Sequence, residues 1–465
     1  MSLYLRDLTQ ALKQIQEKKI NITVIGVGTI GLPLATFLAS AGYNVTGLDI
    51  NEARVKQIND ATVVFEYSDK LKKAVKLNKL RATTKSSDAL KDAEIVFVCV
   101  PTPLNENLAM NNSNLLSATD AIIKNIKAGM LVIYESSVSI GTTRTLIKRI
   151  EENTKLKIGK DIGIAYCPER YNPTLPREIL PQVIYNSKQS DIAYYTIDKV
   201  SRVVGGSDEK SLKLAKRIYS EFITTEVKEV SSIETAEATK LLENIFRDVN
   251  IGLVNELATI FPTFGVDVYE VIDAAKTKPF AFLPHYPGAG VGGECIPVDT
   301  WYLIRQAEEN GLNPKLLKVT REVNDSMPAH TVKLLEEELA QHSKKISGSK
   351  ISVLGLSYKK NIYDTRLSPS LEIVKILKSK GAKVVIYDPI VQQHDSRYEL
   401  NSFEDTFKNS DALMLITDHD AFHLIDLKTV KDLMKTPIVI DGRQFFNKTK
   451  LKSLGFSYRC IGEPK

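Results

Sequence analysis

The sequence predicts an α/β protein with two doubly wound parallel-sheet domains, joined by a central region of long helices. Three observations predict this class. A strand, a glycine-rich turn, a helix and a second strand follow one another near the N-terminus, the same order recurs after residue 350, and a long helical pattern lies between them. The chain has 465 residues, room for about three domains of roughly 150 residues each.

The first α/β unit begins with a buried strand at 21–25, sequence NITVI. A glycine-rich turn follows at once, then an apolar helix at 32–42 that closes on a glycine, then a second strand at 43–51. Further buried strands are expected within 92–103 and 129–137. Strands that alternate with helices in this way indicate parallel pairing with helical crossovers.

The C-terminal part repeats the pattern. A strand at 350–358 runs into a glycine, a helix at 368–382 has apolar positions at helical spacing, and a strand at 383–389 ends in an aspartate. Two more buried strands are expected within 410–420 and 437–443. The recurrence is a repeat of the fold rather than of a short sequence period.

The middle of the chain predicts a long helix. Ser231 and Glu234 have the spacing of a capping box, and residues 235–261 are good helix formers over more than six turns. A helix of that length suits a bridge between two α/β domains. We expect a helical extension at 1–20, a first α/β domain at 21–205, a central helical domain at 206–330 and a second α/β domain at 331–465.

The first 20 residues carry Leu5, Leu8, Leu12 and Ile15 at helical spacing, with charges throughout. This pattern favours a short helix packed on the body, with a helix on a membrane surface as the alternative. It lacks the uncharged apolar core of a signal peptide. No window approaches the roughly 18 uninterrupted apolar residues of a membrane span, so we expect no membrane partner.

The charge balance and the cysteines indicate which class of partner and which compartment to expect. Lys and Arg number 62 against 56 Asp and Glu, a net charge of +6, and no dense basic block occurs, so we expect no nucleic-acid partner. A local cationic site for a phosphate-bearing small molecule is compatible with this balance. The four cysteines stand far apart without a CxxC pair, which favours a reduced, cytoplasmic compartment.

The glycine turn of the first unit carries the pattern Gly26, Gly28 and Gly31. Glycines there permit a tight turn, close approach of a pyrophosphate and close packing of helix on strand. Asp49 ends the second strand, where its carboxylate can accept a ribose 2′-hydroxyl and would repel a 2′-phosphate. The turn therefore predicts a Rossmann dinucleotide site with NAD as the cofactor. Arg54 is expected nearby, on adenine or phosphate, or as a solvated surface residue.

A second glycine-rich segment, 288–293, precedes Cys295 and Asp299. Its backbone can lie against a ligand, and a cysteine presented there is either a nucleophile or a buried cysteine in a turn. The residues leave both interpretations open. The remaining cysteines look structural: Cys99 in an apolar strand, Cys167 before a proline, and Cys460 near the terminus.

The central helix carries Lys240 and Asn244 one turn apart, with Arg247 on the next turn. An ammonium and an amide aimed together can stabilise an oxyanion, and a solvated polar stripe is the alternative. Glu169 follows an apolar strand pattern at 162–166, at the edge of the sheet where a carboxylate can orient or deprotonate water.

The turn that opens the second α/β unit contains polar residues over 355–366, where a phosphate-bearing ligand is expected. His419 and His423 have a spacing that can bind a metal on a helix, but no third ligand is evident nearby. We therefore expect no metal.

Together these motifs resemble those of the nucleotide-sugar 6-dehydrogenase family, which includes UDP-glucose dehydrogenase and the UDP-N-acetylhexosamine dehydrogenases. The resemblance extends over residues 21–445. Its ordered blocks are GVGTIGLPLA, VPTP, ESSVSIGTT, PER, ATKLLEN, GVGGECIPVD, YKKNIYDTRLSPS and DGR. The blocks are far more specific jointly than singly.

The resemblance implies an N-terminal NAD-binding Rossmann domain, a central helical dimerisation region with the catalytic lysine and cysteine, and a C-terminal UDP-binding domain. It implies a UDP-sugar substrate, a homodimer or higher homo-oligomer, and oxidation of the sugar C6 alcohol to a carboxylate with two NAD⁺ and one water. Cys295 is then the nucleophile that carries a thiohemiacetal and a thioester. Lys240 and Asn244 stabilise its oxyanion, Asp299 assists proton transfer, and Glu169 positions or activates the hydrolytic water.

The resemblance also implies ligand contacts. Those to the cofactor fall on Gly26, Gly28, Ile30, Gly31, Asp49, Arg54, Thr102, Ser137 and Arg366. Those to the substrate fall on Arg170, Lys240, Asn244, Arg247, Gly292, Tyr358, Lys359 and Arg443.

The PER block and the NDSMP segment at 324–328 are similar to the N-acetylhexosamine branch, and UDP-glucose 6-dehydrogenase is the alternative. Two positions depart from that branch. Glu294 stands where a histidine is common, and a carboxylate there should raise the pKa of the neighbouring thiol unless cations offset it. Ala281 stands where an arginine that reaches the partner subunit is common, with Lys276 or Lys278 as substitutes.

Two other classes fit parts of the sequence: a catalytically silent NAD- and nucleotide-binding regulator, and a two-electron 3-hydroxyacid dehydrogenase. Measurable turnover that depends on the cysteine argues against both, because a silent regulator has no turnover and the two-electron enzyme needs no nucleophilic thiol.

Overall fold

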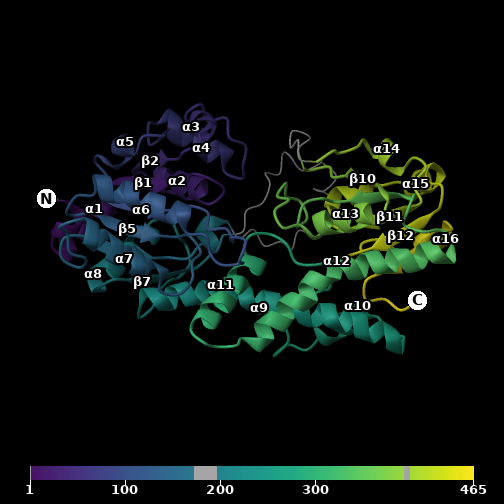
Figure 1. Ribbon diagram of the computed structural model, residues 1–465. Helices are drawn as coiled ribbons and strands as arrows, with labels where there is room; N and C mark the ends of the chain where they lie inside the picture. The colour runs from purple at the N-terminus through teal and green to yellow at the C-terminus, as the bar shows by residue number, and fades with distance from the viewer. Residues whose placement is uncertain (1, 172–195, 392–397) are drawn as a thin grey trace. The chain divides into compact units, whose positions relative to one another are not determined.

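The computed structural model describes residues 2–171, 196–391 and 398–465. They form two compact units, each described here by itself (Figure 1). The described part of the N-terminal unit comprises residues 2–171, 196–243 and 301–306, and the C-terminal unit comprises 244–300, 307–391 and 398–465. The stretch 172–195 of the first expected domain lies outside the described residues.

The N-terminal unit is built on an eight-stranded sheet with the order β3-β2-β1-β4-β5-β6-β7-β8. Every neighbouring pair is parallel except β6 and β7, which are antiparallel. The strands are β1 (Asn21–Ile25), β2 (Asn44–Leu48), β3 (Leu80–Thr83), β4 (Ile95–Val98), β5 (Leu131–Tyr134), β6 (Gly163–Tyr166), β7 (Arg202–Gly206) and β8 (Val227–Glu229).

Both faces of this sheet are buried, as a doubly wound sheet requires. Along β4, Ile95 and Phe97 belong to one apolar core, while Val96 and Val98 belong to the other. The helices of the unit are α1 (Leu8–Gln16), α2 (Gly31–Ser40), α3 (Glu52–Asn59), α4 (Ser68–Lys76), α5 (Ser86–Leu90), α6 (Ser113–Asn125), α7 (Thr142–Asn153) and α8 (Glu209–Tyr219), with 3-10 turns η1 (Leu3–Leu5) and η3 (Ile197–Lys199).

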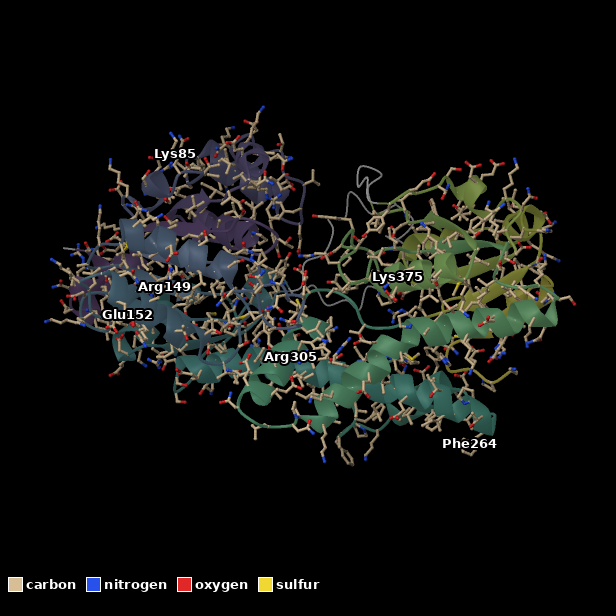
Figure 2. All side chains as sticks on the ribbon, viewed as in Figure 1. Lys85, Arg149, Glu152, Phe264, Arg305 and Lys375 are labelled. Atoms are coloured by element: carbon tan, nitrogen blue, oxygen red, sulfur yellow. The ribbon has the colours of Figure 1, made fainter. Side chains whose placement is uncertain are left out.

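On the surface, Arg149 of α7 makes a two-bond ion pair with Asp120 of α6 (Figure 2).

The N-terminal segment is the expected helix packed on its own unit. Ile15 is fully buried, whereas Leu5 is 41% exposed because η1 ends there and the chain turns before α1. The strand expected within 92–103 is Ile95–Val98, and the two prolines at 101 and 103 lie in the loop that follows it.

The central helix α9 spans Ile233–Ile260, and the division between the units falls within it, after Glu243. Its N-cap is Ser232, whose Oγ accepts from the Thr235 N–H at 3.0 Å, so the predicted capping box at Ser231 is wrong by one residue. Glu234 instead bonds the Arg144 guanidinium at 2.9 Å.

The C-terminal unit has a five-stranded, fully parallel sheet with the order β10-β9-β11-β12-β13. Its strands are β9 (Lys350–Leu354), β10 (Lys383–Tyr387), β11 (Ala412–Leu415), β12 (Ile438–Asp441) and β13 (Ser457–Cys460). Its helical elements are η4 (Phe261–Phe264), α10 (Val268–Ala275), α11 (Ile296–Glu309, shared with the N-terminal unit), α12 (Lys315–Gln341), α13 (Pro369–Ser379), α14 (Phe403–Phe407), η5 (Asp420–Leu424), α15 (Leu427–Leu433) and α16 (Lys448–Ser453).

The two-sheet α/β class is thus confirmed. The boundary expected at residue 330 falls inside α12, which continues through Pro328. In the described part of the chain, no single helix is long and apolar enough to cross a membrane.

Candidate active site

The turn between β1 and α2 has the geometry of a phosphate-binding loop. Gly26 has φ +83°, and a Cβ there would lie 2.6 Å from the carbonyl oxygen of Cys99. A Cβ on Gly31 would collide with the Gly26 carbonyl, so this glycine lets α2 begin against β1. No described atom lies within 4 Å of a Cβ built on Gly28, which is exposed. The N-terminus of α2, with Ile30 as N-cap, therefore offers open backbone to a pyrophosphate.

Asp49 follows β2 and lies beside this turn. Its Oδ2 accepts from the Val27 N–H at 3.0 Å and its Oδ1 from the Asn51 N–H at 3.0 Å. The residue is only partly buried, so the carboxylate keeps acceptor capacity toward a ribose hydroxyl. Arg54 Nε donates to the Val27 carbonyl at 3.0 Å, which places its guanidinium at the same turn. These residues fit NAD.

Thr102 and Ser137 lie on the loops after β4 and β5, which are neighbours in the sheet. The Thr102 hydroxyl donates to the Ser137 carbonyl at 2.7 Å. The strand order reverses between β1 and β4, and in open α/β sheets ligands bind at the carboxyl edge beside this point. The structure brings these two expected cofactor contacts together.

Glu169, three residues after β6, belongs to a buried polar cluster. Arg202 is fully buried and its Nη1 donates to Glu169 Oε1 at 3.0 Å, while Glu135 accepts from the Tyr219 hydroxyl. Burial raises the pKa of Glu135 to about 8, against the lowering effect of Arg202 and with a further rise from Glu169. Burial thus favours the protonated form of this carboxyl. Within the described residues, Glu169 Oε2 and Arg202 Nε and Nη2 are buried without a hydrogen-bond partner.

Lys240 and Arg170 contact this part of the N-terminal unit. The Lys240 ammonium donates to the backbone carbonyl of Glu169. The Arg170 guanidinium donates to the Ser201 carbonyl at 2.8 Å and to Glu243 at 3.1 Å. The structure thus brings Lys240 and Glu169 together.

Cys295 immediately precedes α11 and is exposed, whereas the other three cysteines are buried or partly buried. Thiolate character is favoured at the N-terminus of a helix. The preceding loop lies against Tyr358: a Cβ on Gly292 would lie 2.8 Å from the Tyr358 Cβ, and one on Gly293 would lie 2.7 Å from the ring. Gly293 has φ +86°, and its N–H donates to the Arg366 carbonyl at 3.0 Å. The loop therefore presents an accessible thiol.

Asn244 and Asp299 are both buried in the C-terminal unit. The Asn244 amide donates to Asp299 Oδ2 at 2.6 Å and so joins α9 to the first turn of α11. On α9, Asn244 lies one helical turn after Lys240. Asp299 thus orients the amide.

Three of the expected substrate contacts in the C-terminal unit are cationic: Arg247, Lys359 and Arg443. Burial lowers the pKa of Lys359, with the positive charges of Arg247 and Lys360 adding to the effect. Arg443 crosses Gly288 so closely that a Cβ there would collide with the guanidinium. The positive charges of Arg247 and Lys360 near Lys359 suit a diphosphate.

Glu294 is paired with Arg366, which also bonds both carboxylate oxygens of Asp364. Arg366 is therefore a cation beside the Glu294 carboxylate, but it is shared with Asp364, so one negative charge remains among the three groups. Arg366 belongs to the C-terminal unit, while the other expected cofactor contacts belong to the N-terminal unit.

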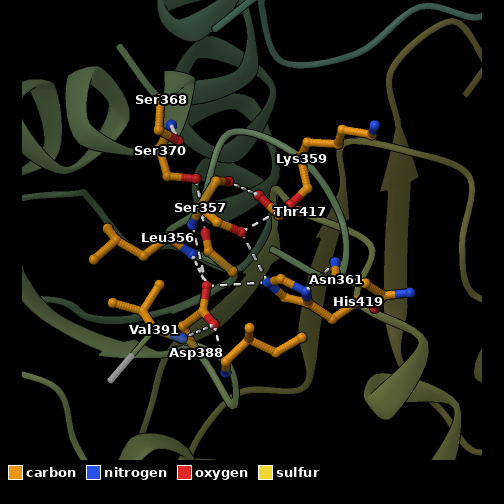
Figure 3. Close-up of polar contacts among 12 residues, drawn as sticks. Leu356, Ser357, Lys359, Asn361, Ser368, Ser370, Asp388, Val391, Thr417 and His419 are labelled. Carbon is orange, nitrogen blue, oxygen red and sulfur yellow. Dashed lines mark hydrogen bonds and ion pairs between the residues drawn. The ribbon is translucent and has the colours of Figure 1, made fainter. Parts of the chain in front are cut away.

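The loop after β9 is held by Asp388 and His419, both fully buried at their side chains (Figure 3). Asp388 Oδ2 accepts from the Leu356 N–H at 2.7 Å and the Ser357 N–H at 3.1 Å, and lies 3.0 Å from His419 Nε2. Burial alone would raise the pKa of Asp388, but His419 and backbone N–H groups lower it to about 2.

Sequence reasoning missed the buried cluster around Arg202, although an arginine that opens an apolar strand was a signal. It also considered His419 only as a metal ligand. In the structure, His419 precedes the 3-10 turn η5 and both its ring nitrogens face protein atoms. Lys276 bonds Asp273, and Lys278 lies over the Phe280 ring.

Comparison with known proteins identifies three consecutive family domains. Residues 20–223 match the NAD binding domain of the UDP-glucose/GDP-mannose dehydrogenase family, residues 234–326 its central domain, and residues 352–448 its UDP binding domain.

Similar proteins cover nearly the whole chain. A UDP-N-acetyl-D-mannosamine dehydrogenase of Pyrococcus horikoshii is 37% identical over 447 residues, 95% of this chain and 99% of the relative. A UDP-N-acetyl-D-glucosamine 6-dehydrogenase of Pseudomonas aeruginosa is 31% identical over 91% of this chain and 96% of its own. The solved structure of UDP-D-ManNAc dehydrogenase from Pyrococcus horikoshii superposes with a TM-score of 0.84 at 35% identity, covering 95% of this chain and 99% of that one.

Proposed function

We propose, on the premise that this chain belongs to the UDP-glucose/GDP-mannose dehydrogenase family and is an NAD-dependent UDP-sugar dehydrogenase, that it oxidises a UDP-N-acetylhexosamine at C6 to the uronate. The substrate is UDP-N-acetylglucosamine or UDP-N-acetylmannosamine. The observation that carries this choice is the similarity over almost the full length to dehydrogenases named for these two sugars. Arg170 in the PER block agrees with it.

The cofactor site in this proposal is the β1–α2 turn with Asp49 and Arg54, together with Thr102 and Ser137. Two NAD⁺ molecules bound there in turn would each accept one hydride, one for each oxidation. The open backbone at Gly28 takes the pyrophosphate, and Asp49 takes the ribose hydroxyl. Arg366 is proposed as a further cofactor contact.

The substrate site is proposed on the C-terminal unit. Lys359, Arg247 and Arg443 bind the diphosphate in this proposal. Burial and then the charge of Arg247 lower the pKa of Lys359, so an anion there would stabilise both cations, and Arg443 lies against the backbone at Gly288. Tyr358 and Gly292 line the approach to the thiol. This assignment agrees with the match of 352–448 to a UDP binding domain.

The chemistry centres on Cys295. Its thiolate adds to the C6 aldehyde left by the first oxidation, and a C–S bond forms while the carbonyl electron pair becomes an oxyanion. Lys240 and Asn244 stabilise that oxyanion. The covalent bond retains the aldehyde until the second oxidation gives the thioester.

Hydrolysis then needs a base. Glu169 takes a proton from water, the water oxygen bonds to the thioester carbonyl carbon, and the C–S bond breaks with its electron pair returning to sulfur. Asp299 orients Asn244 and assists proton transfer. The products are the uronate and the free thiolate.

The proposal includes a homodimer or higher homo-oligomer formed through α9. Phe246, Leu253 and Ile260 are exposed at intervals of seven residues, the spacing of a helix that packs against another helix. Phe264, 77% exposed, lies just beyond the end of this row (Figure 2). Light scattering should give at least a dimer for the wild type and a smaller species for Leu253→Lys, with the exposed Leu77→Lys as control. A wild-type monomer contradicts this part of the proposal.

The test of the substrate is a panel of UDP-sugars with NAD⁺. The kcat/KM should be highest for UDP-N-acetylglucosamine or UDP-N-acetylmannosamine, and a preference for UDP-glucose would favour the alternative activity. Cys295→Ser should abolish uronate formation and leave NADH binding unchanged. Full uronate formation by this variant would contradict the covalent mechanism.

A further inference from the structure

The loop between β9 and α13 has two separate anchors that bracket its polar residues. Asp388 accepts the N–H groups of Leu356 and Ser357 at the start of the loop. Further along, in the middle of the loop, the Asn361 N–H donates to His419 Nδ1 at 2.9 Å. Tyr358 and Lys359 lie between the two anchors.

The hydrogen bonds fix the protonation state of His419. Asn361 N–H is a donor only, so Nδ1 must be the unprotonated acceptor and Nε2 must carry the hydrogen. Nε2 faces Asp388 Oδ2 at 3.0 Å and Ser357 Oγ at 3.1 Å. Since Ser357 donates its own hydrogen to the Lys359 carbonyl at 2.9 Å, its oxygen is an acceptor there. His419 is therefore a neutral imidazole in the Nε2–H form.

Through this arrangement one histidine joins the two ends of the 356–361 segment. Its Nε2–H bonds the carboxylate that holds residues 356 and 357, and its Nδ1 holds residue 361 (Figure 3). Thr417 adds a bond to the Ser357 carbonyl at 2.5 Å. The backbone that carries Lys359 is thus ordered before an anion arrives, which reduces the entropy lost on binding.

The anchoring matters because the loop carries charge in a half-buried place. Burial lowers the pKa of Lys359, and the positive charges of Arg247 and Lys360 add to the effect. A loop free to move would relax the ammonium into solvent and lose its alignment with the diphosphate. Rigid support of a binding side chain by a second layer of hydrogen bonds is the usual means of preventing this.

We propose that His419 is a positioning residue for the UDP-sugar: as an Nε2–H imidazole between Asp388 and the Asn361 N–H, it holds the 356–361 loop so that Tyr358 and Lys359 meet the nucleotide diphosphate. This inference rests on the proposed function, which assigns those two side chains to the substrate.

Two substitutions separate the two bonds of His419. In His419→Gln the amide nitrogen reaches the position of Nε2 and keeps the bond to Asp388, but the Asn361 N–H loses its acceptor. In His419→Asn the amide oxygen takes the position of Nδ1 and keeps the Asn361 bond, but the buried Asp388 carboxylate loses the bond from the ring and keeps only its backbone N–H donors. His423→Gln, an exposed histidine in the same 3-10 turn, is the matched control.

The loss of one hydrogen bond to the loop should raise KM for the UDP-sugar, and Kd for UDP in calorimetry, by about 3- to 10-fold in His419→Gln. The variant should keep kcat at saturating substrate and Kd for NADH. His419→Asn should show the reverse: a Tm lower by about 3 °C or more, with KM near the wild-type value. If UDP affinity instead falls in proportion to Tm in both variants, His419 is merely structural and the proposal is overturned.

A direct check is the ¹⁵N spectrum of the histidine rings. His419, assigned by its loss in His419→Gln, should show an unprotonated Nδ1 and a protonated Nε2 with UDP absent or present. The opposite tautomer contradicts the proposed bonding. Lys359→Met separates this inference from its premise. Unchanged UDP affinity in Lys359→Met refutes the assignment of the loop to the substrate. Weaker UDP affinity in Lys359→Met, together with unchanged UDP affinity in His419→Gln, refutes only the role of His419.

Discussion

The two α/β units have an aspartate at the same place in the fold, but the two carboxylates differ in their exposure and in the groups that they contact. In each, an aspartate after the second strand accepts backbone N–H groups from the glycine turn after the first: Asp49 from Val27, and Asp388 from Leu356 and Ser357. Asp49 is left partly open, whereas Asp388 is closed over by His419. The open acid can serve a ligand, and the closed acid serves the loop. A repeat of fold therefore does not imply a repeat of ligand.

The largest effect is expected when the buried aspartate of the C-terminal unit is removed, and it is a loss of stability. Asp388→Ala removes the acceptor of four backbone N–H groups and of His419, and leaves them buried without a partner. We expect a loss of about 3–5 kcal/mol in the free energy of unfolding of the C-terminal unit, measured by urea denaturation. A loss below about 1 kcal/mol would mean that the closed acid is not a structural anchor.

The same substitution in the other unit should act on the cofactor. Asp49→Ala should raise KM for NAD⁺ by about 10- to 100-fold, because charge-assisted bonds to ribose hydroxyls contribute about 1.5–3 kcal/mol. KM for the UDP-sugar should stay near the wild-type value. Steady-state kinetics with each substrate varied in turn provides the measurement, and an unchanged KM for NAD⁺ would refute the assignment of the open acid.

The two units should also lose stability in opposite directions of pH change. Asp388, with its pKa lowered from 3.8 to about 2, stabilises its unit above pH 4, and this contribution is lost as pH falls from 4 to 2. Glu135, with its pKa raised from 4.5 to about 8, binds its proton more tightly in the folded state, so the N-terminal unit loses stability as pH rises from 4.5 to 8.

Glu135→Gln tests the alkaline half of this prediction. The amide stands in for the protonated acid, so the fall in Tm between pH 6 and pH 8.5 should be smaller in the variant than in the wild type. Scanning calorimetry at matched ionic strength measures it. Parallel curves for the two proteins would show that Glu135 is not the group that titrates.

The smallest effect on stability is expected at one of the two glycines of the β1–α2 turn, Gly28, when it is compared with Gly26. A Cβ on Gly28 meets open space, so Gly28→Ala should change the free energy of unfolding by less than about 0.5 kcal/mol and leave Tm nearly unchanged. The same variant should raise KM for NAD⁺. Gly26→Ala meets the Cys99 carbonyl at φ +83° and should lower Tm by several degrees. Equal effects on Tm would contradict the open approach proposed for the pyrophosphate.

The sequence predicted the elements with strong periodicity and the residues at strand ends. The strand at 21–25 appears with those bounds, and Asp49 and Glu169 lie after the strands that were expected to present them. Local patterns suffice there because alternating strands and helices leave few topologies.

What it did not predict depends on long-range burial. Arg202 reads as the start of an ordinary strand, and only the fold brings it to Glu169, 33 residues away. His419 and Asp388 are 31 residues apart, and nothing in either segment indicates that one covers the other. The pairing of Glu294 with Arg366 joins residues that are 72 apart in the sequence, and no local pattern in either segment predicts it.

The central claim is that one chain oxidises its sugar twice through Cys295 before release. The most direct test is the ratio of NADH formed to UDP-N-acetylhexosamine consumed, with the product identified by mass spectrometry. The account predicts two NADH per sugar and a uronate as the only accumulating product. One NADH per sugar, or release of the aldehyde, would contradict it.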